Sequence, residues 1–383
     1  MITREVKHIS QEANFNLLHP LLREWFKNKF GNFTEPQLYS IPLIHKKENV
    51  LISAETGTGK TLAAFTAILN ELIYREEAGN LENKVYCMYI SPLRALSRDI
   101  EINLKEPLKE IEEIAKKQGK KIDIPIAVRT GDTTPSERAK MLRKIPKILI
   151  TTPESAAILL NSPKFKENLR TLEWIIIDEI HSLAENKRGV HLSLTLERLQ
   201  RISPGLCRIG LSATVAPLED VAAFLAGMEN EKQTRPCRIV DVSFLKKTDL
   251  KVISPLPSFI NITQKQISEA LYTQIDQLIQ SHKTTLIFTN TRSATERVVH
   301  HLKEKFPKNY SEGNIGAHHS SLSREHRIAI ENRLKKGELR AVVCSTSLEL
   351  GIDIGYIDLV VLLGSPKSVA RAIQRMGRSG HQL

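Results

Sequence analysis

The sequence predicts an α/β protein with two successive domains, each a mostly parallel sheet flanked by helices. Short apolar runs rich in β-branched residues alternate with segments of helical periodicity, which is typical of doubly wound folds. The runs are apolar throughout, as in parallel strands that helices cover on both faces. At 383 residues the chain is also longer than one hydrophobic core usually supports.

Two series of expected strands follow one another along the chain. In the first domain we expect strands at residues 49–53, 85–91, 147–151, 174–178 and 208–212. In the second domain we expect them at residues 284–289, 315–318, 341–345 and 359–363. Residues 101–121 carry alternating charge blocks and predict an amphipathic helix with a solvated outer face.

A polar segment at residues 228–265 separates the two series. It holds three prolines and shows no helical periodicity, as expected of a connection between domains. We therefore expect one domain over residues 1–235 and a second over residues 236–383. Within the connection, residues 237–242 and 250–253 are candidate edge strands.

The charge balance is basic. The chain carries 55 Lys and Arg residues against 43 Asp and Glu, a formal net charge of +12, and the surplus is +8 in residues 236–383 against +4 before them. This suggests a polyanionic partner such as nucleic acid, although a protein that is merely basic is an equally good interpretation.

Other features of the composition concern location. No run reaches the roughly 20 apolar residues of a membrane helix, and the first residues lack an apolar signal segment. The 4 cysteines are widely spaced and form no C-x-x-C pair. We therefore expect a reducing, cytoplasmic location and no zinc site.

A phosphate-binding loop is the strongest motif. The sequence AETGTGKT at residues 54–61 follows an expected strand and opens a helix, the context that such a loop requires. We expect backbone N–H groups to wrap phosphate oxygens, Lys60 to reach the β and γ phosphates, and Thr61 to bind Mg²⁺. Ala54 departs from the usual glycine at the first position. The candidate nucleotide-binding residues are Thr56, Gly57, Thr58, Gly59, Lys60 and Thr61.

Two carboxylates end the strand expected at residues 174–178. Asp178 and Glu179 follow four apolar residues, and ligands of open α/β sheets bind at such strand ends. Asp178 suits the Mg²⁺ shell, and Glu179 suits polarising the attacking water. An isolated acidic pair is more often a helix cap or surface charge, but the phosphate loop earlier in the chain favours catalysis. The two motifs together predict an ATPase or GTPase.

In the order of its motifs the chain resembles the superfamily 2 helicases, which have a tandem RecA-like core. In the first domain the resemblance is carried by FTEPQ at 33–37, SPLRAL at 91–96, TGD at 130–132, TTPE at 151–154, DEIH at 178–181 and LSAT at 211–214. In the second domain it is carried by IFTNTR at 287–292, AHHSSL at 317–322, STSLELGID at 345–353 and QRMGRSGH at 374–381. Each stretch alone is a weak signal, and their common order at strand ends is a strong one.

The resemblance implies ATP and Mg²⁺ as cofactors and gives single residues roles. Further nucleotide-binding positions would be Thr34 and Gln37 at the adenine, with Gly351 and Asp353. Nucleic-acid-binding positions would be Pro92, Arg94, Gly131, Thr152, Pro153, Asn290, Arg292, Ser320 and Thr346. Coupling positions would be His181, Ser212, Thr214 and His381. The catalytic set would be Lys60, Asp178, Glu179, Arg378 as the first choice of arginine finger, and Arg375 as the second.

Within superfamily 2 the chain is most similar to the Lhr (large helicase-related) group. The residues that carry this similarity are Arg188, Gly189 and His191, TGDT at 130–133, GSPKSV at 364–369 and the ending GRSGH. Many other superfamily 2 helicases have arginine where His381 stands, and Lhr-type sequences commonly have histidine. The similarity implies 3′-to-5′ movement on single-stranded DNA, displacement of DNA or RNA strands including DNA/RNA hybrids, a role in DNA repair or recombination, a monomer, and a nucleoid-associated location.

Two alternatives stay open at this point. A DExH RNA helicase of the exosome-associated kind shares most motifs, and His381 argues mildly against it. An ATP-switched remodelling or annealing factor would use ATP only to change its binding. Because Lhr-type proteins carry a winged-helix domain and further domains after the last motif, we also expect a second domain cut short there. Such a fragment would keep ATP binding and lose most unwinding.

Overall fold

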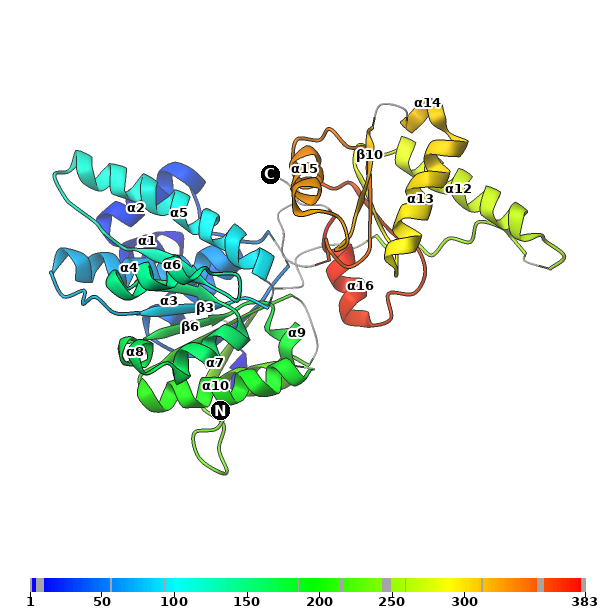
Figure 1. Cartoon of the computed structure of the whole chain (residues 1–383). Helices are drawn as coiled ribbons and strands as arrows, with labels where there is room; N and C mark the ends of the chain where they lie inside the picture. Colours follow the sequence, from blue (N-terminus) through cyan, green and yellow to red (C-terminus); the bar gives the residue numbers. More distant parts are fainter. Residues whose placement is uncertain are drawn as a thin grey trace. The chain divides into compact units, whose positions relative to one another are not determined.

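Two separate parallel sheets organise the computed structural model. The structure describes residues 2–4, 10–55, 57–92, 94–184, 186–213, 217–242, 249–258, 260–310, 313–349 and 355–379. Residue contacts divide the chain into two compact units, residues 1–245 and 246–383. Each unit contains one sheet with helices packed on it (Figure 1).

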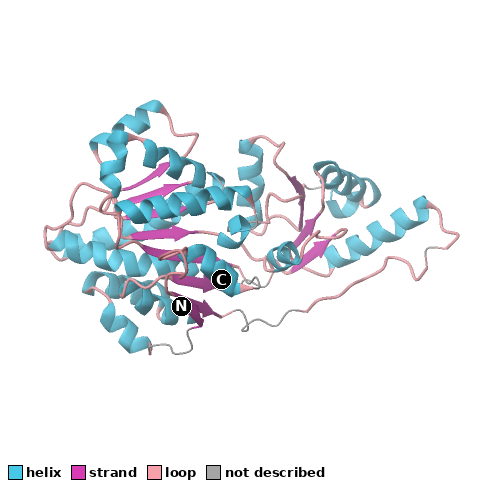
Figure 2. Ribbon diagram, turned by 90° about the horizontal axis from the view of Figure 1, so that it is seen from below, coloured by secondary structure: helices cyan, strands magenta, loops and turns pink. Residues whose placement is uncertain are grey.

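The first unit is built on an eight-stranded sheet in which every pair of neighbours is parallel (Figure 2). The strands are β1 (Ile2–Arg4), β2 (Val50–Ser53), β3 (Cys87–Ile90), β4 (Ile126–Arg129), β5 (Ile148–Thr151), β6 (Trp174–Ile177), β7 (Cys207–Ser212) and β8 (Cys237–Asp241). Their order across the sheet is β1-β8-β2-β7-β6-β3-β5-β4. The five strands expected in this part of the sequence are confirmed as β2, β3, β5, β6 and β7.

Helices cover both faces of this sheet, which is why its strands are apolar throughout. One face packs against α1 (Gln11–Leu17), α2 (Pro20–Phe30), α3 (Glu35–His45), α4 (Lys60–Glu77) and α5 (Arg94–Lys117). The other packs against α6 (Pro135–Arg143), α7 (Pro153–Asn161), α8 (Pro163–Lys166), α9 (Ile180–Ala184), α10 (Lys187–Ile202) and α11 (Leu218–Ala226), and a 3-10 turn spans Glu167–Leu169. Figure 1 shows α2, α4 and α5 on one side of β3 and β6, and α7, α8 and α10 on the other.

The amphipathic helix expected at residues 101–121 is part of the longer α5, which ends at Lys117. Its apolar side, with Leu104, Leu108 and Ile111, is buried in the core of the first unit. The amphipathic helix is therefore confirmed, with different ends from those expected.

The connection between the two strand series differs from the expectation. Residues 237–242 supply β8, which lies between β1 and β2 inside the first sheet, not at its edge. The first unit therefore extends beyond residue 235. Residues 250–253 form no strand, and Val252 is almost fully exposed. An apolar run without a neighbouring strand has no ladder to join.

The second unit has a four-stranded parallel sheet in the order β10-β11-β9-β12. The strands are β9 (Thr285–Phe288), β10 (Ile315–His318), β11 (Ala341–Cys344) and β12 (Leu359–Leu362), and all four were expected. The helices are α12 (Gln264–Gln280), α13 (Arg292–Lys305), α14 (Pro307–Tyr310), α15 (Arg324–Lys335) and α16 (Val369–Met376). One core joins α12, α13 and α14 to the sheet, and another joins α15 to its opposite face.

Both sheets confirm the predicted fold class, two α/β units with mostly parallel sheets flanked by helices. Within the described part of the chain, no helix is both long enough and apolar enough to cross a membrane.

Candidate nucleotide and nucleic-acid sites

Among the described residues, the candidates in the phosphate loop, the acidic motif and the segments expected to contact nucleic acid lie at the carboxyl ends of the parallel strands, whereas Thr34 and Gln37 lie at the start of α3. The phosphate loop follows β2, Ser212 ends β7, and Asp178 follows β6; these three strands are neighbours in the sheet. The segments expected to contact nucleic acid follow β3, β5 and β4, which are the next three neighbours. The strand order thus divides one edge of the sheet into a half with the candidate nucleotide-binding residues and a half with the candidate nucleic-acid-binding residues, called below the nucleotide half and the nucleic-acid half.

The phosphate loop has the backbone geometry that its glycines allow. Gly57 and Gly59 have left-handed φ angles of 82° and 85°, which cost other residues free energy. Gly59 also lies against Gln37, because a Cβ added there would come within 2.5 Å of Gln37 Nε2. The first glycine position of the motif is filled by Ala54, which is buried.

Gln37 and Thr34 join α3 to the phosphate loop. The side chain of Gln37 accepts a hydrogen bond from Thr34 N (2.9 Å) and donates one to Gly59 O (3.4 Å). The hydroxyl of Thr34 donates to Thr58 O at 2.8 Å. The resemblance assigned both residues to adenine binding. In the structure, their contacts are those of a helix cap that supports the phosphate loop.

Lys60 is the first residue of α4, and its side chain is folded onto the loop. The ammonium donates to the carbonyl oxygens of Ala54 and of Glu55, the latter at 2.7 Å. The Lys60 side chain is therefore held at the centre of the loop that it is expected to serve.

The acidic pair stands where β6 turns into α9. Asp178 N donates to Ile90 O at 2.9 Å, so the pairing of β6 with β3 continues one residue past the strand. Glu179 has a left-handed φ of 47°, which is rare for a residue with a side chain and typical of functional sites. Burial and the neighbouring Glu179 charge together raise the pKa of Asp178 above its ordinary value, and the Lys60 ammonium offsets part of this.

Tyr89 is a neighbour of the acidic pair that the motifs did not indicate. It lies on β3, is fully buried, and its ring stacks on Phe65 of α4 at 5.4 Å between centroids. Its hydroxyl forms no hydrogen bond of good geometry to any residue that the structure describes. Burial and the nearby charge of Asp178 raise the pKa of this phenol. Its apolar sequence context gave no signal of a role.

The oxygen donors at this point suit Mg²⁺. The hydroxyl of Thr61, in the first turn of α4, and the carboxylate of Asp178 are the hard ligands that this ion prefers. Asp178 is buried beside the second carboxylate, Glu179, and a cation bound there would compensate the negative charge. Among the described residues, no three His, Cys, Asp or Glu side chains are grouped to hold a metal ion by themselves.

His181 connects the acidic pair to β7. Its Nδ1 lies 3.0 Å from the hydroxyl of Ser212, and its Nε2 lies 3.3 Å from a carboxylate oxygen of Glu179. All three side chains are buried. The structure thus brings together two of the residues expected to couple hydrolysis to strand binding.

The nucleic-acid candidates of the first unit differ in accessibility. Gly131 is exposed after β4, whereas Pro92, Thr152 and Pro153 are buried. The hydroxyl of Thr152 caps α7 by accepting a hydrogen bond from Ser155 N at 3.4 Å. Arg94 begins α5, so the backbone there is helical.

The candidates of the second unit follow three adjacent strands. Asn290, Ser320 and Thr346 come after β9, β10 and β11, whose carboxyl ends lie at one edge of the sheet. Arg292 begins α13 and donates to Ser321 Oγ at 2.6 Å. Asn290 Nδ2 donates to Ser365 O at 3.0 Å. Ser320 and Thr346 are exposed.

The two candidate arginine fingers are buried within the second unit. Arg375 of α16 donates to a carboxylate oxygen of Glu349 at 3.1 Å, and its guanidinium lies over the ring of Phe288. Arg378 donates to Glu349 O at 3.1 Å. Arg371, which the motif search left out, is half exposed on the same helix and lies 3.6 Å from the other Glu349 oxygen.

Five expected site residues fall outside the described part of the chain: Thr56, Thr214, Gly351, Asp353 and His381.

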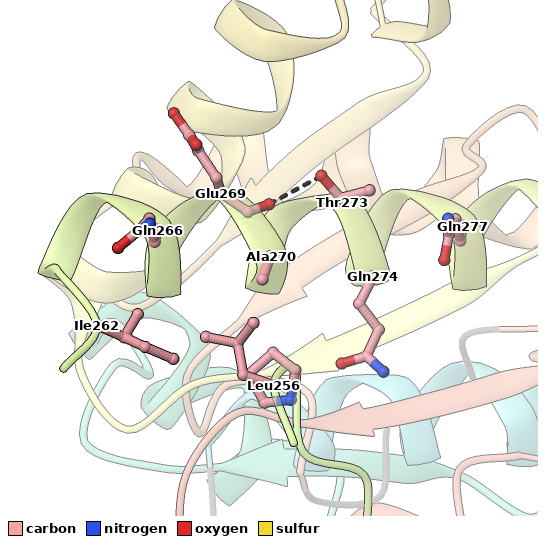
Figure 3. Close-up of a pocket in the computed structure, with 9 residues that line it drawn as sticks. Leu256, Ile262, Gln266, Glu269, Ala270, Thr273, Gln274 and Gln277 are labelled. Atoms are coloured by element: carbon pink, nitrogen blue, oxygen red, sulfur yellow. Dashed lines mark hydrogen bonds between the residues drawn. The ribbon is translucent and has the colours of Figure 1, made fainter. Parts of the chain in front are cut away.

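A pocket of about 580 Å³ lies away from these residues, between α12 and the segment that precedes it (Figure 3). Leu256 and Ile262 face Gln266, Ala270 and Gln274 there, and Glu269 is the charged residue among those that line it. Without a lysine, an arginine or a glycine-rich turn, this pocket is unsuited to nucleotide phosphates.

The fold of the first unit, with a phosphate loop after β2 and an acidic pair after β6, defines a P-loop nucleotide hydrolase. Two family models match the chain, the DEAD/DEAH box helicase over residues 34–221 and the helicase conserved C-terminal domain over residues 267–382. The ATP-dependent helicase Lhr-Core of Methanothermobacter thermautotrophicus is 58% identical over 100% of this chain and 44% of its own length. The Lhr helicase/uracil glycosylase of Escherichia coli is 36% identical over 96% of this chain and 26% of its own length.

A solved structure gives the same result. The helicase Lhr of Mycobacterium smegmatis, bound to single-stranded DNA and AMP-PNP, has a TM-score of 0.82 and 39% identity, over 96% of this chain and 47% of its own. The chain belongs to the superfamily 2 helicases of the Lhr type, a family of ATP-hydrolysing enzymes. It spans less than half the length of the curated relatives that it matches.

Proposed function

We propose that the chain is the ATP-driven motor core of a helicase that moves 3′ to 5′ along single-stranded DNA. The observation that carries the proposal is the divided edge of the first sheet. Nucleotide motifs follow β2, β7 and β6, and nucleic-acid motifs follow β3, β5 and β4, so one rigid sheet holds both sets. The basic surplus of the chain agrees with a polyanionic substrate.

The chemistry follows from the residues at the nucleotide half. The Lys60 ammonium would exchange its loop carbonyl partners for β and γ phosphate oxygens. Mg²⁺, held by Thr61 and Asp178, would neutralise phosphate charge when bound. Glu179, which is buried beside Asp178, would orient and deprotonate the attacking water. His181 would link the Glu179 carboxylate to Ser212, because one ring nitrogen lies beside each of them.

The second unit would contribute Arg378 and Arg375 as catalytic arginines, with Arg378 as the first choice. Asn290, Arg292, Ser320 and Thr346 would hold phosphates of the strand at their edge of the sheet. Contacts of this kind position a strand without reading its bases. The Mycobacterium smegmatis relative was solved with single-stranded DNA and AMP-PNP bound, which supports a DNA strand and a nucleotide as the ligands of this chain.

Further properties are part of the same proposal. We expect action on DNA/RNA hybrids as well as on DNA duplexes, a monomer in solution, and a role in DNA repair or recombination. A location at the nucleoid follows from the proposed substrate.

Stimulation of ATP hydrolysis tests the proposal. Turnover is measured without nucleic acid and with single-stranded DNA, single-stranded RNA or hybrid duplex, at two salt concentrations. Single-stranded DNA should stimulate most, and half-saturation should shift to higher DNA concentration at higher salt. Glu179→Gln should bind ATP with ordinary affinity and lose at least about 100-fold in turnover. Unchanged turnover in Glu179→Gln would sink the catalytic assignment.

The alternatives predict other results in the same assay. Stronger stimulation by RNA would identify an RNA helicase. Direction is tested by displacement of streptavidin from biotinylated strands: a 3′-to-5′ motor clears the 5′ end and not the 3′ end. ATP-dependent changes in strand affinity without any displacement would identify a remodelling or annealing factor.

A further inference from the structure

Arg188 joins three elements of the first unit with one side chain. Its Nε donates to Glu154 Oε1 at 2.6 Å and its Nη2 to Glu154 Oε2 at 3.2 Å, a two-pronged pairing. The same Nη2 donates to Pro92 O at 2.8 Å. Arg188 lies on α10, Glu154 on α7 after β5, and Pro92 after β3.

The start of α10, which carries Arg188, is fixed on the catalytic side. Asn186 caps the helix by accepting hydrogen bonds from Arg188 N (2.9 Å) and Gly189 N (3.2 Å). A Cβ on Gly189 would lie 1.9 Å from Leu183 O, so only glycine allows this approach of α10 to α9. Since α9 follows the acidic pair directly, this close approach joins the start of α10 to the helix after Glu179.

Glu154 lies in an unfavourable place for a carboxylate. It belongs to the loop and helix start after β5, one of the segments proposed to face strand phosphates. An uncompensated carboxylate there would repel a phosphate backbone. The guanidinium of Arg188 holds the pKa of Glu154 below its usual range, which shows that the carboxylate is charged and compensated. The three hydrogen bonds to Glu154 and Pro92 need N–H groups held in fixed directions on a planar group. The ammonium of a lysine does not offer that geometry.

The pair contributes little to stability alone, because both side chains are about half exposed, 42% for Arg188 and 51% for Glu154. Its geometry is better explained by the two segments that it ties together. Those segments, after β3 and β5, are adjacent at the nucleic-acid half of the sheet edge.

We propose that Arg188 is a positioning residue for strand binding, which ties the segments after β3 and β5 together and neutralises Glu154. The inference rests on the proposed function, since it concerns the same strand. Arg188 acts through Glu154 and Pro92 and does not itself contact the phosphates.

The structure offers a matched control. Arg198 lies on the same helix and donates to Asn161 Oδ1 of α7 at 2.6 Å, so it ties the same two helices at their other end. Arg198→Ala therefore removes an arginine and a link between α10 and α7 without touching the segments after β3 and β5.

Binding of a fluorescein-labelled single-stranded DNA is measured by anisotropy with the full chain. Arg188→Ala should weaken binding by about ten-fold, Arg188→Lys should fall between it and the wild type, and Arg198→Ala should bind as the wild type does. Adding Glu154→Gln to Arg188→Ala should restore most of the lost affinity, because the uncompensated carboxylate is gone. Thermal unfolding of each variant confirms that the fold is retained.

Two results would overturn the inference. Equal binding by Arg188→Ala and Arg198→Ala would show that the tie has no role in strand binding. A double variant as weak as Arg188→Ala would show that neutralisation of Glu154 is not what Arg188 contributes to strand binding. Failure of the wild type to bind any single strand would instead remove the proposed function, so the two failures are distinguishable.

Discussion

The guanidinium of Arg375 donates two hydrogen bonds of 3.1 Å to one carboxylate oxygen of Glu349, and both side chains are buried. Glu349 follows β11, whereas Arg375 lies on α16, which comes after β12. The backbone carbonyl of Glu349 also accepts a hydrogen bond from Arg378. One acidic residue therefore holds both of the arginines that the sequence assigned to catalysis.

Removal of this carboxylate should destabilise the second unit. Glu349→Ala leaves the Arg375 charge buried without its partner, a change that typically costs about 3–5 kcal/mol. Urea unfolding followed by far-UV circular dichroism measures the loss. Arg371→Ala is the control, because Arg371 is half exposed and 3.6 Å from Glu349, and it should cost less than about 1 kcal/mol. Equal losses in the two variants would contradict the burial argument.

Asp178→Asn should stabilise the chain in the absence of nucleotide. Burial and Glu179 raise the pKa of Asp178, so the ionised side chain is unfavourable in the folded state at neutral pH. Replacing the carboxylate by a neutral amide removes this cost. Thermal unfolding at pH 7.5 should show a higher Tm for the variant, together with the loss of ATP hydrolysis. A lower Tm would mean that the carboxylate is stabilised by the protein alone.

Tyr89, on β3, and Tyr86, just before it, should respond differently when their hydroxyl groups are removed. The Tyr89 hydroxyl is buried without a hydrogen bond of good geometry among the described residues, so Tyr89→Phe should leave stability unchanged or raise it by about 1 kcal/mol. The Tyr86 hydroxyl accepts a hydrogen bond from Glu82 N at 3.0 Å, so Tyr86→Phe should cost about 1 kcal/mol. Urea titrations of both variants check the contrast, and a destabilised Tyr89→Phe would reveal a bond from its hydroxyl to Asp178.

Glu173, the residue before β6, should make the stability of the fold depend on pH. Burial acts to raise the pKa of Glu173, but hydrogen bonds from Arg75 (2.9 Å at Nη2) and Lys47 (2.6 Å) outweigh it and the pKa is lowered. A carboxyl whose folded pKa is lowered stabilises the fold above its unfolded pKa and loses that contribution as pH falls through the folded pKa.

Glu173→Gln should therefore be less stable than the wild type at pH 7, by about 1–2 kcal/mol. The difference should shrink below pH of about 4.5, where the unfolded carboxyl becomes protonated. Thermal unfolding of both proteins across this range measures it. A difference that stays constant down to pH 3 would show that the carboxyl contributes by packing and not by charge.

The sheets could be predicted because their strands are apolar on both faces, a signal that does not depend on the partner. β6, with Trp174 and three isoleucines, is an example. β4 was missed because its residues are only half-buried at the edge of the sheet. Residues 250–253 show the reverse, an apolar run that no strand accompanies, since periodicity gives no information about pairing.

The candidate site was predictable at the level of motifs and their order along the chain. Which side chain meets which was not, because contacts depend on the register of distant elements. Gln37 reaches Gly59, and Arg188 reaches Glu154 and Pro92, only once α3, α10 and the sheet are in place. Tyr89 is a further example, since nothing in an apolar strand marks the residue whose hydroxyl ends beside Asp178.

The strand order of the first sheet also limits where its two halves can influence each other. Along the edge, β6 is the last strand with a nucleotide motif and β3 the first with a nucleic-acid motif. The hydrogen bond from Asp178 N to Ile90 O spans this border. Under the proposed function, a structural change that passes through the sheet from the nucleotide to the bound strand would therefore cross one spacing between neighbouring strands, about 5 Å. If the proposed function holds, force would pass between the two halves over the width of one pair of hydrogen-bonded strands.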